Sequence, residues 1–380
     1  MRILMISPSS GGIDTYVESL KSALERAGDN EVMIDGIRQM DGAKQNEALF
    51  NYKTNKWMSS SQVKKIAENA ARRIKFEKYD LIAFHYGKND IEQYLPVILS
   101  NRRGLVPNSV YFVHYLSRNL FSEYLDDFNT QYQVERQVGN FYDGYVFFGK
   151  YAKKFMEHQY KKQFNGIINF LPETHSHEIL DRRDSKDLTK RFVHPLVTKY
   201  NLPLIVWPGF PAHYKDYFSL LRSLQDLDSS MALLFVGRGW KKYLGFSSKK
   251  IGKCFVYCID KYLQSKEYAF LTRKSLFGIL LYRQPNNPKE VFQGSGTLSN
   301  FIYEGKAVIV FNEGAMAEYV GDAGIILKDK KLKTITTAIK KMLIPELRMK
   351  YERLAINRKT LFDINLHARK CLSFFNKLLI

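Results

Sequence analysis

The stretch RILMISPSSGGIDTYVESLKSAL at residues 2–24 decides the fold expected for this chain. It opens with an apolar run at residues 3–6 that stops at a loop of serine, proline and glycine, which predicts a buried strand. Apolar residues then recur at helical spacing up to Leu24, and a second extended run follows at residues 31–34. Strand, glycine loop, helix and strand in this order are typical of a parallel α/β domain.

The same alternation continues over the first half of the chain and begins again in the second half. Further buried strands are predicted at residues 80–84, 110–113, 144–148, 204–207, 232–236, 255–257, 277–281, 308–311 and 324–327. Between residues 172 and 203 the periodicity gives way to a charged segment, where we place an interdomain linker. We therefore predict an α/β protein with two Rossmann-like, doubly wound domains, at 1–185 and 186–360, and a C-terminal helix at 361–380 that packs back towards the first domain.

The composition favours a folded protein that attracts anions. Lysine and arginine number 58 against 38 aspartates and glutamates, a formal charge of +20, so nucleotides, nucleic acid and acidic membranes are all compatible partners. No aromatic-basic motif or recognition helix is visible, so nucleic acid is not expected. Three cysteines are too few for a disulfide framework, which favours the cytoplasm. No apolar run approaches the roughly 20 residues that span a bilayer.

Two basic segments in the first half, residues 64–78 and 150–162, are predicted to be helical. In the second of them one helical face is apolar and another is basic, with Tyr151, Ala152, Phe155 and Met156 on the first and Lys150, Lys154 and Lys161 on the other. Such a helix permits docking on an anionic lipid surface, and an ordinary solvated helix face is the alternative. A peripheral position on the inner face of the cell membrane therefore stands beside the cytoplasm as a second location.

Three glycine-rich loops follow predicted strands and precede predicted helices, where backbone N–H groups and the helix dipole favour an anion. They contain Gly11 and Gly12, then Gly209 and Lys215, then the run from Gly294 to Asn300. The lysine stands at a helix start and can neutralise a diphosphate. Taken singly, the first loop could merely turn the chain and the lysine could merely face water. The first loop lacks the third glycine of the dinucleotide fingerprint, which disfavours NAD.

These loops and their strands resemble the GT-B nucleotide-sugar glycosyltransferases, specifically glycosyltransferase family 4, over nearly the whole chain. The matching segments are residues 11–17, 79–85, 110–114, 209–215, 235–239, 305–309, 314–320 and 322–324. They are similar to the family's G-G-[IV]-x-x-[YH]-[VI], D-[VI]-[VI]-H-x-H, V-x-T-x-H, G-R-x-x-x-x-K, [IV]-[VI]-G-x-G, G-K-P-V-[VI], G-G-x-x-E-x-[VI] and D-x-G patterns. Phe210 stands where the fourth pattern has arginine. The resemblance implies two domains facing a central cleft, with the donor in the second.

The resemblance also implies a set of donor-binding residues. They are Gly11, Gly12, Gly209, Lys215, Gly237, Arg238, Gly294, Ser295, Gly296, Thr297, Asn300 and Glu318. Retaining members carry two glutamates separated by seven residues, whereas this chain has Gln293 at the first position and Asn300 at the second. Both carboxylates are absent, so the resemblance leaves the stereochemistry, and activity itself, open. Gln293 is expected to line the donor pocket as an altered catalytic residue.

His114 is the second candidate catalytic residue. It stands at a predicted strand end, and a neutral imidazole can accept or donate a proton near pH 7. A satisfied core histidine is the alternative, and His85 is a weaker candidate of the same kind. Asp226 and Asp228 form a D-x-D that precedes a strand instead of ending one, so a solvated helix end is favoured. No metal and no cofactor besides the substrate nucleotide sugar is expected.

We therefore expect a cytoplasmic hexosyltransferase of polysaccharide biosynthesis. It would move a hexose from a nucleoside diphosphate sugar, with a UDP-sugar favoured, onto a cell-surface glycan or lipid-linked acceptor. Two alternatives stay open. A catalytically silent GT-B subunit that binds and stabilises a partner glycosyltransferase would fit the missing glutamates, and a nucleotide-sugar epimerase would share the fold. Donor turnover by the chain alone tests the first alternative, and release of an epimerised sugar without acceptor tests the second.

Overall fold

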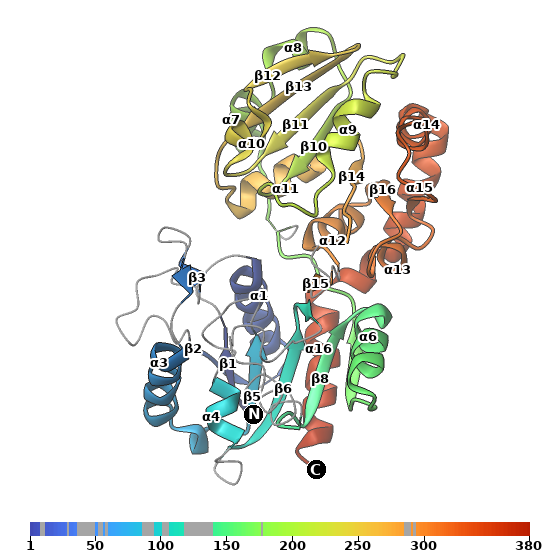
Figure 1. Ribbon diagram of the computed structural model, residues 1–380. Coiled ribbons are helices and arrows are strands. Elements are labelled where there is room, and N and C mark those ends of the chain that lie inside the picture. Colours follow the sequence, from blue (N-terminus) through green and yellow to red (C-terminus); the bar gives the residue numbers. More distant parts are fainter. Residues whose placement is uncertain are drawn as a thin grey trace. The chain divides into compact units, whose positions relative to one another are not determined.

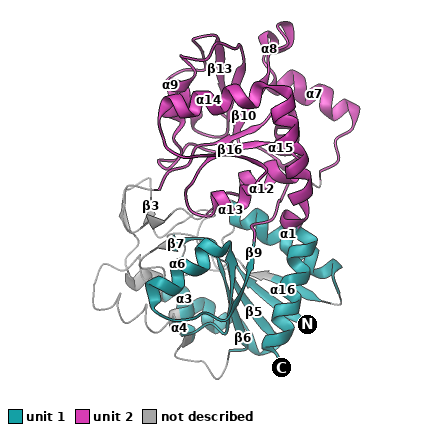
Figure 2. Ribbon diagram, turned by 90° about the vertical axis from the view of Figure 1, so that its right-hand side faces the viewer, with its two compact units in different colours: residues 1–169, 286–293, 364–380 teal, residues 170–285, 294–363 magenta. Residues whose placement is uncertain are grey.

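The computed structural model describes residues 1–7, 12–28, 30–35, 50–51, 56–57, 60–85, 95–100, 106–117, 140–175, 178–284, 290–291 and 294–380. The chain forms two compact units, coloured separately in Figure 2. Unit 1 comprises residues 1–169, 286–293 and 364–380, and unit 2 comprises residues 170–285 and 294–363. Neither unit is a single continuous segment of the chain.

Unit 1 is built on a parallel sheet with the strand order β2-β1-β5-β6-β8-β9. Its strands are β1 (Arg2–Ile6), β2 (Glu31–Asp35), β5 (Leu81–His85), β6 (Asn108–Val113), β8 (Gly144–Phe148) and β9 (Gly166–Asn169). Strands β5 and β8 are buried along their whole length, as parallel strands covered on both faces must be. The strands predicted in this half are confirmed, and β9 is an edge strand that the sequence did not reveal.

Helices cover this sheet, and the last of them comes from the end of the chain. They are α1 (Gly12–Arg26), α3 (Ser60–Arg73), α4 (Leu95–Ser100), α6 (Lys150–Tyr160), α16 (Ile364–Leu378) and the 3-10 turn η1 (Phe76–Lys78). Short antiparallel pairs join β3 (Phe50–Asn51) to β4 (Lys56–Trp57) and β7 (Leu116–Ser117) to β15 (Glu290–Val291). Figure 1 shows α16 alongside α1. Phe374 packs so closely on Gly144 that a Cβ there would lie 2.6 Å from its ring.

The apolar face of α6 is committed to the core of unit 1. Ala152 and Met156 are fully buried, and Tyr151 and Phe155 pack against the same cluster. Tyr151 and Phe155 are partly buried, so this face is largely used within the fold, and docking of the helix on a lipid surface stays a prediction. The charge of exposed lysines such as Lys154 is available for such a role. In the described part of the chain no helix is both long and apolar enough to cross a bilayer.

Unit 2 contains two sheets, with the orders β10-β11-β13-β12 and β14-β16-β17. Its strands are β10 (Leu204–Pro208), β11 (Ala232–Val236), β12 (Ser248–Ile251), β13 (Cys254–Ile259), β14 (Gly278–Leu280), β16 (Val308–Phe311) and β17 (Gly324–Leu327). All pairs are parallel except β12 with β13, a hairpin that was not predicted. The two sheets adjoin at β10 and β14, where Leu276 N donates to Leu204 O at 2.8 Å. The strands predicted in this half are confirmed.

Helices surround these two sheets. They are α7 (Arg182–Phe192), α8 (Pro195–Lys199), α9 (Tyr217–Ser223), α10 (Trp240–Leu244), α11 (Ser265–Lys274), α12 (Gly296–Tyr303), α13 (Met316–Val320), α14 (Leu332–Leu343), α15 (Pro345–Arg358) and the 3-10 turn η4 (Lys359–Phe362). The charged segment interpreted as a linker is largely α7, which Asp181 caps by accepting from Asp184 N at 2.7 Å. Leu188 and Phe192 anchor this helix in the core. The units accordingly divide at residue 169 and not at 185.

Candidate functional site

The loop after β10 folds back on itself around Lys215. Gly209 turns the chain with a φ of +96°, which favours glycine, and Asp216 caps α9 by accepting from Ser219 N at 3.2 Å. The Lys215 ammonium donates to the carbonyl oxygen of Phe210 at 2.6 Å. A Cβ on Gly209 would lie only 3.2 Å from Lys215 Nζ. The Lys215 ammonium therefore lies directly against the turn that follows β10.

Lys215 is a buried cation without an anionic partner among the described residues. It is 6% exposed, and its printed polar contact is a neutral carbonyl. The neighbouring carboxylate of Asp216 is already paired with Arg283. Burial lowers the pKa of Lys215 to about 7, because removal from water disfavours the ammonium. An anion beside Nζ would restore the charged form and be bound in return.

The loop after β11 packs against the same turn. A Cβ on Gly237 would lie 2.3 Å from the carbonyl oxygen of Gly209, so only glycine permits this approach. Gly239 N donates to Asp260 Oδ1 at 2.6 Å, and the side chain of Arg238 is exposed. The predicted residues of these two loops therefore lie next to each other at the carboxyl ends of adjacent parallel strands, where α/β folds bind ligands.

The third predicted loop begins α12. Ser295 is the N-cap of this helix and accepts from Leu298 N at 3.3 Å. Thr297 Oγ1 accepts a hydrogen bond from the Tyr268 hydroxyl at 2.7 Å. A Cβ on Gly296 would come no closer than 3.5 Å to the nearest side chain outside its own helix. The helix start thus combines free backbone N–H groups with side-chain hydroxyls, a combination suited to a phosphate.

Tyr282 connects the lysine loop to the start of α12. Its backbone forms an antiparallel bridge with Lys215, and its ring centroid lies 5.7 Å from Lys215 Nζ. Burial raises the pKa of the Tyr282 phenol, and its side-chain hydrogen bonds with Ser295 and Thr297 act in the opposite direction. One buried tyrosine therefore touches both the ammonium and the helix terminus. Sequence reasoning missed it because it ends the apolar run 276–282, which predicts only a strand.

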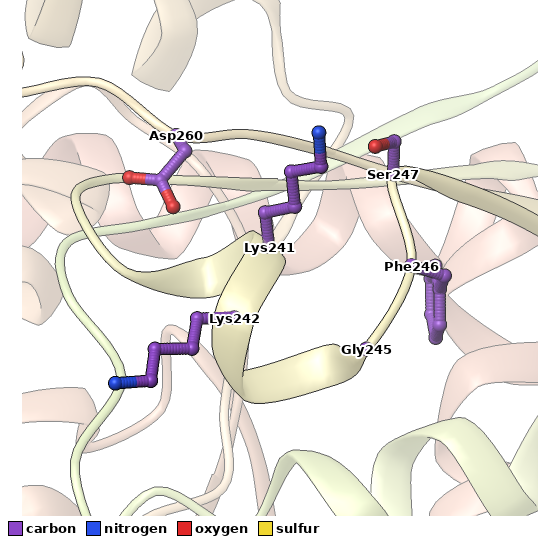
Figure 3. Close-up of a pocket in the computed structure, with 6 residues that line it drawn as sticks. All are labelled: Lys241, Lys242, Gly245, Phe246, Ser247 and Asp260. Atoms are coloured by element: carbon purple, nitrogen blue, oxygen red, sulfur yellow. The ribbon is translucent and has the colours of Figure 1, made fainter.

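An open surface pocket, called here the cavity beside α10, has a volume of about 590 Å³ (Figure 3). It is lined by Lys241, Lys242, Gly245, Phe246, Ser247 and Asp260. Asp260 joins this cavity to the loop after β11, because its carboxylate accepts from Gly239 N. The volume lies within the roughly 300–1,000 Å³ of small-molecule pockets. These side chains were not predicted, since α10 has only five residues and shows no helical periodicity in the sequence.

Two further residues predicted to bind the donor already form hydrogen bonds within unit 2. Asn300 is 3% exposed, and its Oδ1 accepts from Thr174 N at 3.2 Å. Glu318 lies on α13, where its backbone carbonyl accepts from Arg358 at 2.8 Å. The side chain of Asn300 is thus used to hold a loop, whereas only the backbone of Glu318 takes part in its bond with Arg358.

The remaining predicted donor residues are distributed as follows. Gly294 lies against the ring of Tyr319, to which a Cβ would approach within 3.3 Å. Gly12 is the first residue of α1 in unit 1. Gly11 and Gln293 fall outside the described residues. Of the three predicted loops, the structure therefore brings together those that hold Lys215 and Ser295.

The described ranges contain no group of His, Cys, Asp and Glu side chains that could hold a metal ion. In the D-x-D sequence, the carboxylate of Asp228 pairs with Lys340 at 2.6 Å. Its hydrogen bond to that lysine holds the pKa of Asp228 below its usual value. Asp228 therefore forms a surface ion pair that links the segment between α9 and β11 to α14.

His114 directly follows β6 in unit 1 and belongs to a cluster of uncharged rings. Its Nε2 lies 3.2 Å from His85 Nδ1, and its ring meets Tyr16 edge-on at 4.9 Å between centroids. The Tyr16 hydroxyl lies 2.7 Å from His367 Nε2. Burial lowers the pKa of both His114 and His367 to about 3. The His114 ring is therefore neutral at pH 7, and its catalytic role stays a prediction.

Whole-structure comparisons find folds similar to this chain. Sucrose-phosphate synthase from Thermosynechococcus elongatus matches with a TM-score of 0.70 and 14% identity, covering 100% of this chain and 99% of that one. HepE from Anabaena, in complex with UDP-glucose, matches with 0.63 and 15%, covering 98% and 99%. A UDP-forming trehalose-phosphate synthase from Burkholderia xenovorans matches with 0.67 and 10%, covering 100% and 99%. No family model matches the chain, and no curated protein matches its sequence.

These matches extend over the whole chain and show its fold. Two α/β units with parallel sheets, each covered by helices, form the GT-B fold. The predicted fold class, two Rossmann-like doubly wound domains with C-terminal helices, is confirmed. The identities of 10–15% establish the fold and leave the chemistry to the residues of the site.

Proposed function

We propose that this chain is a glycosyltransferase that takes a hexose from a nucleoside diphosphate sugar, with a UDP-sugar as the favoured donor. The observation that carries the proposal is the buried ammonium of Lys215, unpaired among the described residues and linked through Tyr282 to the start of α12. A buried cation next to a helix N-terminus is a site for an anion. The similar folds include one in complex with UDP-glucose and one that is UDP-forming, which supports this choice of anion.

In this proposal the donor diphosphate lies between Lys215 and the first turn of α12. The ammonium neutralises the phosphate charge, and the backbone N–H groups of Gly296 and Thr297 donate to phosphate oxygens. The diphosphate gains negative charge as the glycosidic bond breaks, so a cation already in place stabilises the transition state. The cavity beside α10 is our proposed location for the nucleoside, since it adjoins the same loops through Asp260. Gln293 and Glu318 remain proposed donor contacts.

Titration calorimetry with UDP tests the proposal most directly. A charge-assisted phosphate contact contributes about 1.5–3 kcal/mol, so Lys215→Ala should weaken UDP binding by roughly ten-fold to one hundred-fold. Lys333→Ala removes an exposed lysine on α14 and is the matched control, with unchanged affinity expected. Equal UDP affinity for wild type and a folded Lys215→Ala protein would exclude this diphosphate site.

For the acceptor we propose a cell-surface glycan or a lipid-linked sugar, handled in the cytoplasm at or near an anionic membrane. The charge of +20 supports attraction to such surfaces, although the apolar face of α6 is largely used within the fold. Co-sedimentation with anionic and neutral vesicles tests this part. Binding to anionic vesicles alone, lost as salt rises, supports it; equal behaviour with both vesicle types counts against it.

A catalytically silent subunit that stabilises a partner glycosyltransferase is the second candidate. It is favoured by the Asn300 side chain, which holds Thr174 N at a position where retaining relatives are expected to have a catalytic-site glutamate. Mass spectrometry of the purified chain with a panel of UDP-sugars and acceptors separates the two. Donor turnover supports the transferase, whereas tight UDP binding without turnover supports the silent subunit.

A further inference from the structure

The ends of β5 and β6 bring two imidazoles together inside unit 1. The two strands pair in parallel, with His85 opposite Phe112, and His114 lies two residues beyond that position. His85 is fully buried and its ring stacks on Phe112 at 4.1 Å between centroids. His114 is only partly buried. His85 Nδ1 and His114 Nε2 are 3.2 Å apart, a distance at which one nitrogen donates a proton and the other accepts it.

Both rings are neutral, so each carries a single ring proton. The groups around the pair are the rings of Tyr16, Phe112 and Phe148 and the buried imidazole of His367, and no described carboxylate hydrogen-bonds to either histidine. Burial is the main reason why protonation is disfavoured for both histidines. The hydrogen bond therefore has two forms. Either His85 donates through Nδ1–H, or His114 donates through Nε2–H.

The far nitrogen of His85 distinguishes the two forms. Among the described residues, His85 Nε2 is buried without a hydrogen-bond partner. If His114 donated, the His85 proton would sit on Nε2 as a buried N–H with no acceptor. If His85 donates, Nε2 is a bare lone pair. Orphaned buried N–H groups are rare, whereas unsatisfied acceptors are tolerated more often. The form in which His85 donates is therefore favoured.

We propose that His85 is a positioning residue that fixes His114 as the tautomer with its proton on Nδ1. His114 then presents an N–H donor, not a basic lone pair, on the side away from His85. The group it suits is an oxygen with free lone pairs, such as a sugar hydroxyl or a phosphate oxygen. This inference rests on the proposed function for the identity of that ligand, but the tautomer itself does not depend on it.

Long-range ¹H–¹⁵N NMR of ¹⁵N-histidine-labelled protein at pH 7 tests the tautomer without any activity. The His114 signals are assigned from their loss in His114→Gln. Nitrogen shifts of a neutral ring protonated on Nδ1 support the proposal. Shifts of a ring protonated on Nε2, or of a charged imidazolium, overturn it.

Two substitutions of His85 test the positioning role. His85→Phe keeps a ring but removes the donor, so His114 should shift towards the Nε2–H tautomer. His85→Asn offers an amide N–H near the place of Nδ1 and should keep the native tautomer. Circular dichroism and thermal unfolding check that both proteins fold. If folded His85→Phe leaves the His114 tautomer unchanged, or if His85→Asn changes it as much as the phenylalanine does, the positioning role is overturned.

Transfer assays then separate this inference from the proposed function. With an active wild type, His85→Phe should lower kcat by roughly ten-fold with little change in donor KM, and His85→Asn should restore most of it. Equal loss in both variants would count against the inference. A wild type that carries the Nδ1–H tautomer but shows no transfer would contradict the proposed function and support the inference.

Discussion

Unit 1 and unit 2 each bury basic side chains at the carboxyl ends of parallel strands, yet burial leaves them in different states. In unit 2 it lowers the pKa of Lys215 to about 7, so close to half of the molecules carry the charge at neutral pH. In unit 1 it lowers the pKa of His114 and His367 to about 3, so neither is charged. The same loss of hydration acts on groups with different ordinary pKa values. The buried lysine of unit 2 can therefore offer a cation to a ligand, whereas the buried histidines of unit 1 offer only neutral donors and acceptors.

The largest expected effect is a loss of stability of unit 1 at acidic pH. Because the folded-state pKa of His114 and His367 lies below the unfolded value near 6.5, the unfolded chain binds their protons first. Stability is then complete above about pH 6.5 and falls progressively towards pH 3, by about 2 kcal/mol for each histidine at pH 5. Hydrogen exchange of β5 and β6 at pH 7.5 and pH 5, with rising denaturant, measures this loss.

A matched pair of variants assigns that acid effect. His367→Gln should reduce the difference in stability between the two pH values by about 2 kcal/mol, whatever its effect at pH 7.5. His158→Gln, at an exposed position on α6, should leave the difference unchanged. Equal pH dependence in wild type and His367→Gln would show that the buried histidines are not its source.

The close approach of Gly237 to Gly209 should make unit 2 sensitive to one methyl group. In Gly237→Ala the new Cβ would overlap a backbone oxygen at 2.3 Å, with φ at +147°, so we expect a loss of about 1–3 kcal/mol in stability and at least ten-fold weaker UDP binding. Gly245→Ala, at φ +75° with nothing within 4 Å, should cost only about 1 kcal/mol and serves as the control for stability alone, because Gly245 lines the proposed nucleoside cavity. Wild-type UDP affinity in a folded Gly237→Ala protein would show that this loop does not contact the ligand.

Proton uptake on UDP binding should sharpen the contrast between the two units. A bound diphosphate favours the charged lysine, so at pH 7 the complex should take up about half a proton through Lys215, and UDP affinity should fall by up to about ten-fold per pH unit above pH 7. Calorimetry in buffers of different ionisation enthalpy measures the uptake. The Lys215→Ala variant gives the proton uptake that is due to UDP itself. An uptake in that variant equal to that of the wild type would rule out Lys215 as its source.

The smallest effect is expected at Tyr282. Tyr282→Phe keeps the ring beside Lys215 but removes the hydroxyl that bonds Ser295 and Thr297, so UDP should bind roughly five-fold more weakly, equivalent to about 1 kcal/mol. Tyr262→Phe removes a phenol from a side chain that is 69% exposed and serves as the control. A Tyr282→Phe protein with wild-type affinity would show that the tyrosine only fills space.

The strands were predictable because each is a short apolar run between turn residues, as β5 and β11 illustrate. Helix α7 was not, because most of its residues are charged and only Leu188 and Phe192 report its buried face. Edge strand β12 escaped for a related reason: its sequence is Ser-Lys-Lys-Ile, and its pairing with β13 depends on the turn at Gly252. Local hydrophobic pattern thus reveals central strands better than edge strands and charged helices.

Part of the site was also predictable. The spacing of Gly209 and Lys215 follows from a single loop, so the sequence alone could place them together. The contact of Lys215 with Tyr282 joins loops that are far apart in the chain, and local pattern carries no sign of it. The environment of His114 likewise comes from His85 and His367, residues far from it in the chain, so the sequence gives no sign of how far burial lowers its pKa.

The return of α16 to unit 1 has a consequence for the order in which the protein is completed during translation. Phe374 packs on Gly144 and His367 on Tyr16, so the sheet of unit 1 lacks part of its covering until α16 has been synthesised. Unit 2, whose residues end at 363, emerges from the ribosome in full before unit 1 can close. The half that is synthesised first should therefore be the half that finishes folding last. Pulse proteolysis of nascent chains stalled on a C-terminal linker, long enough to bring either residue 363 or residue 378 outside the ribosome, would show whether this is so.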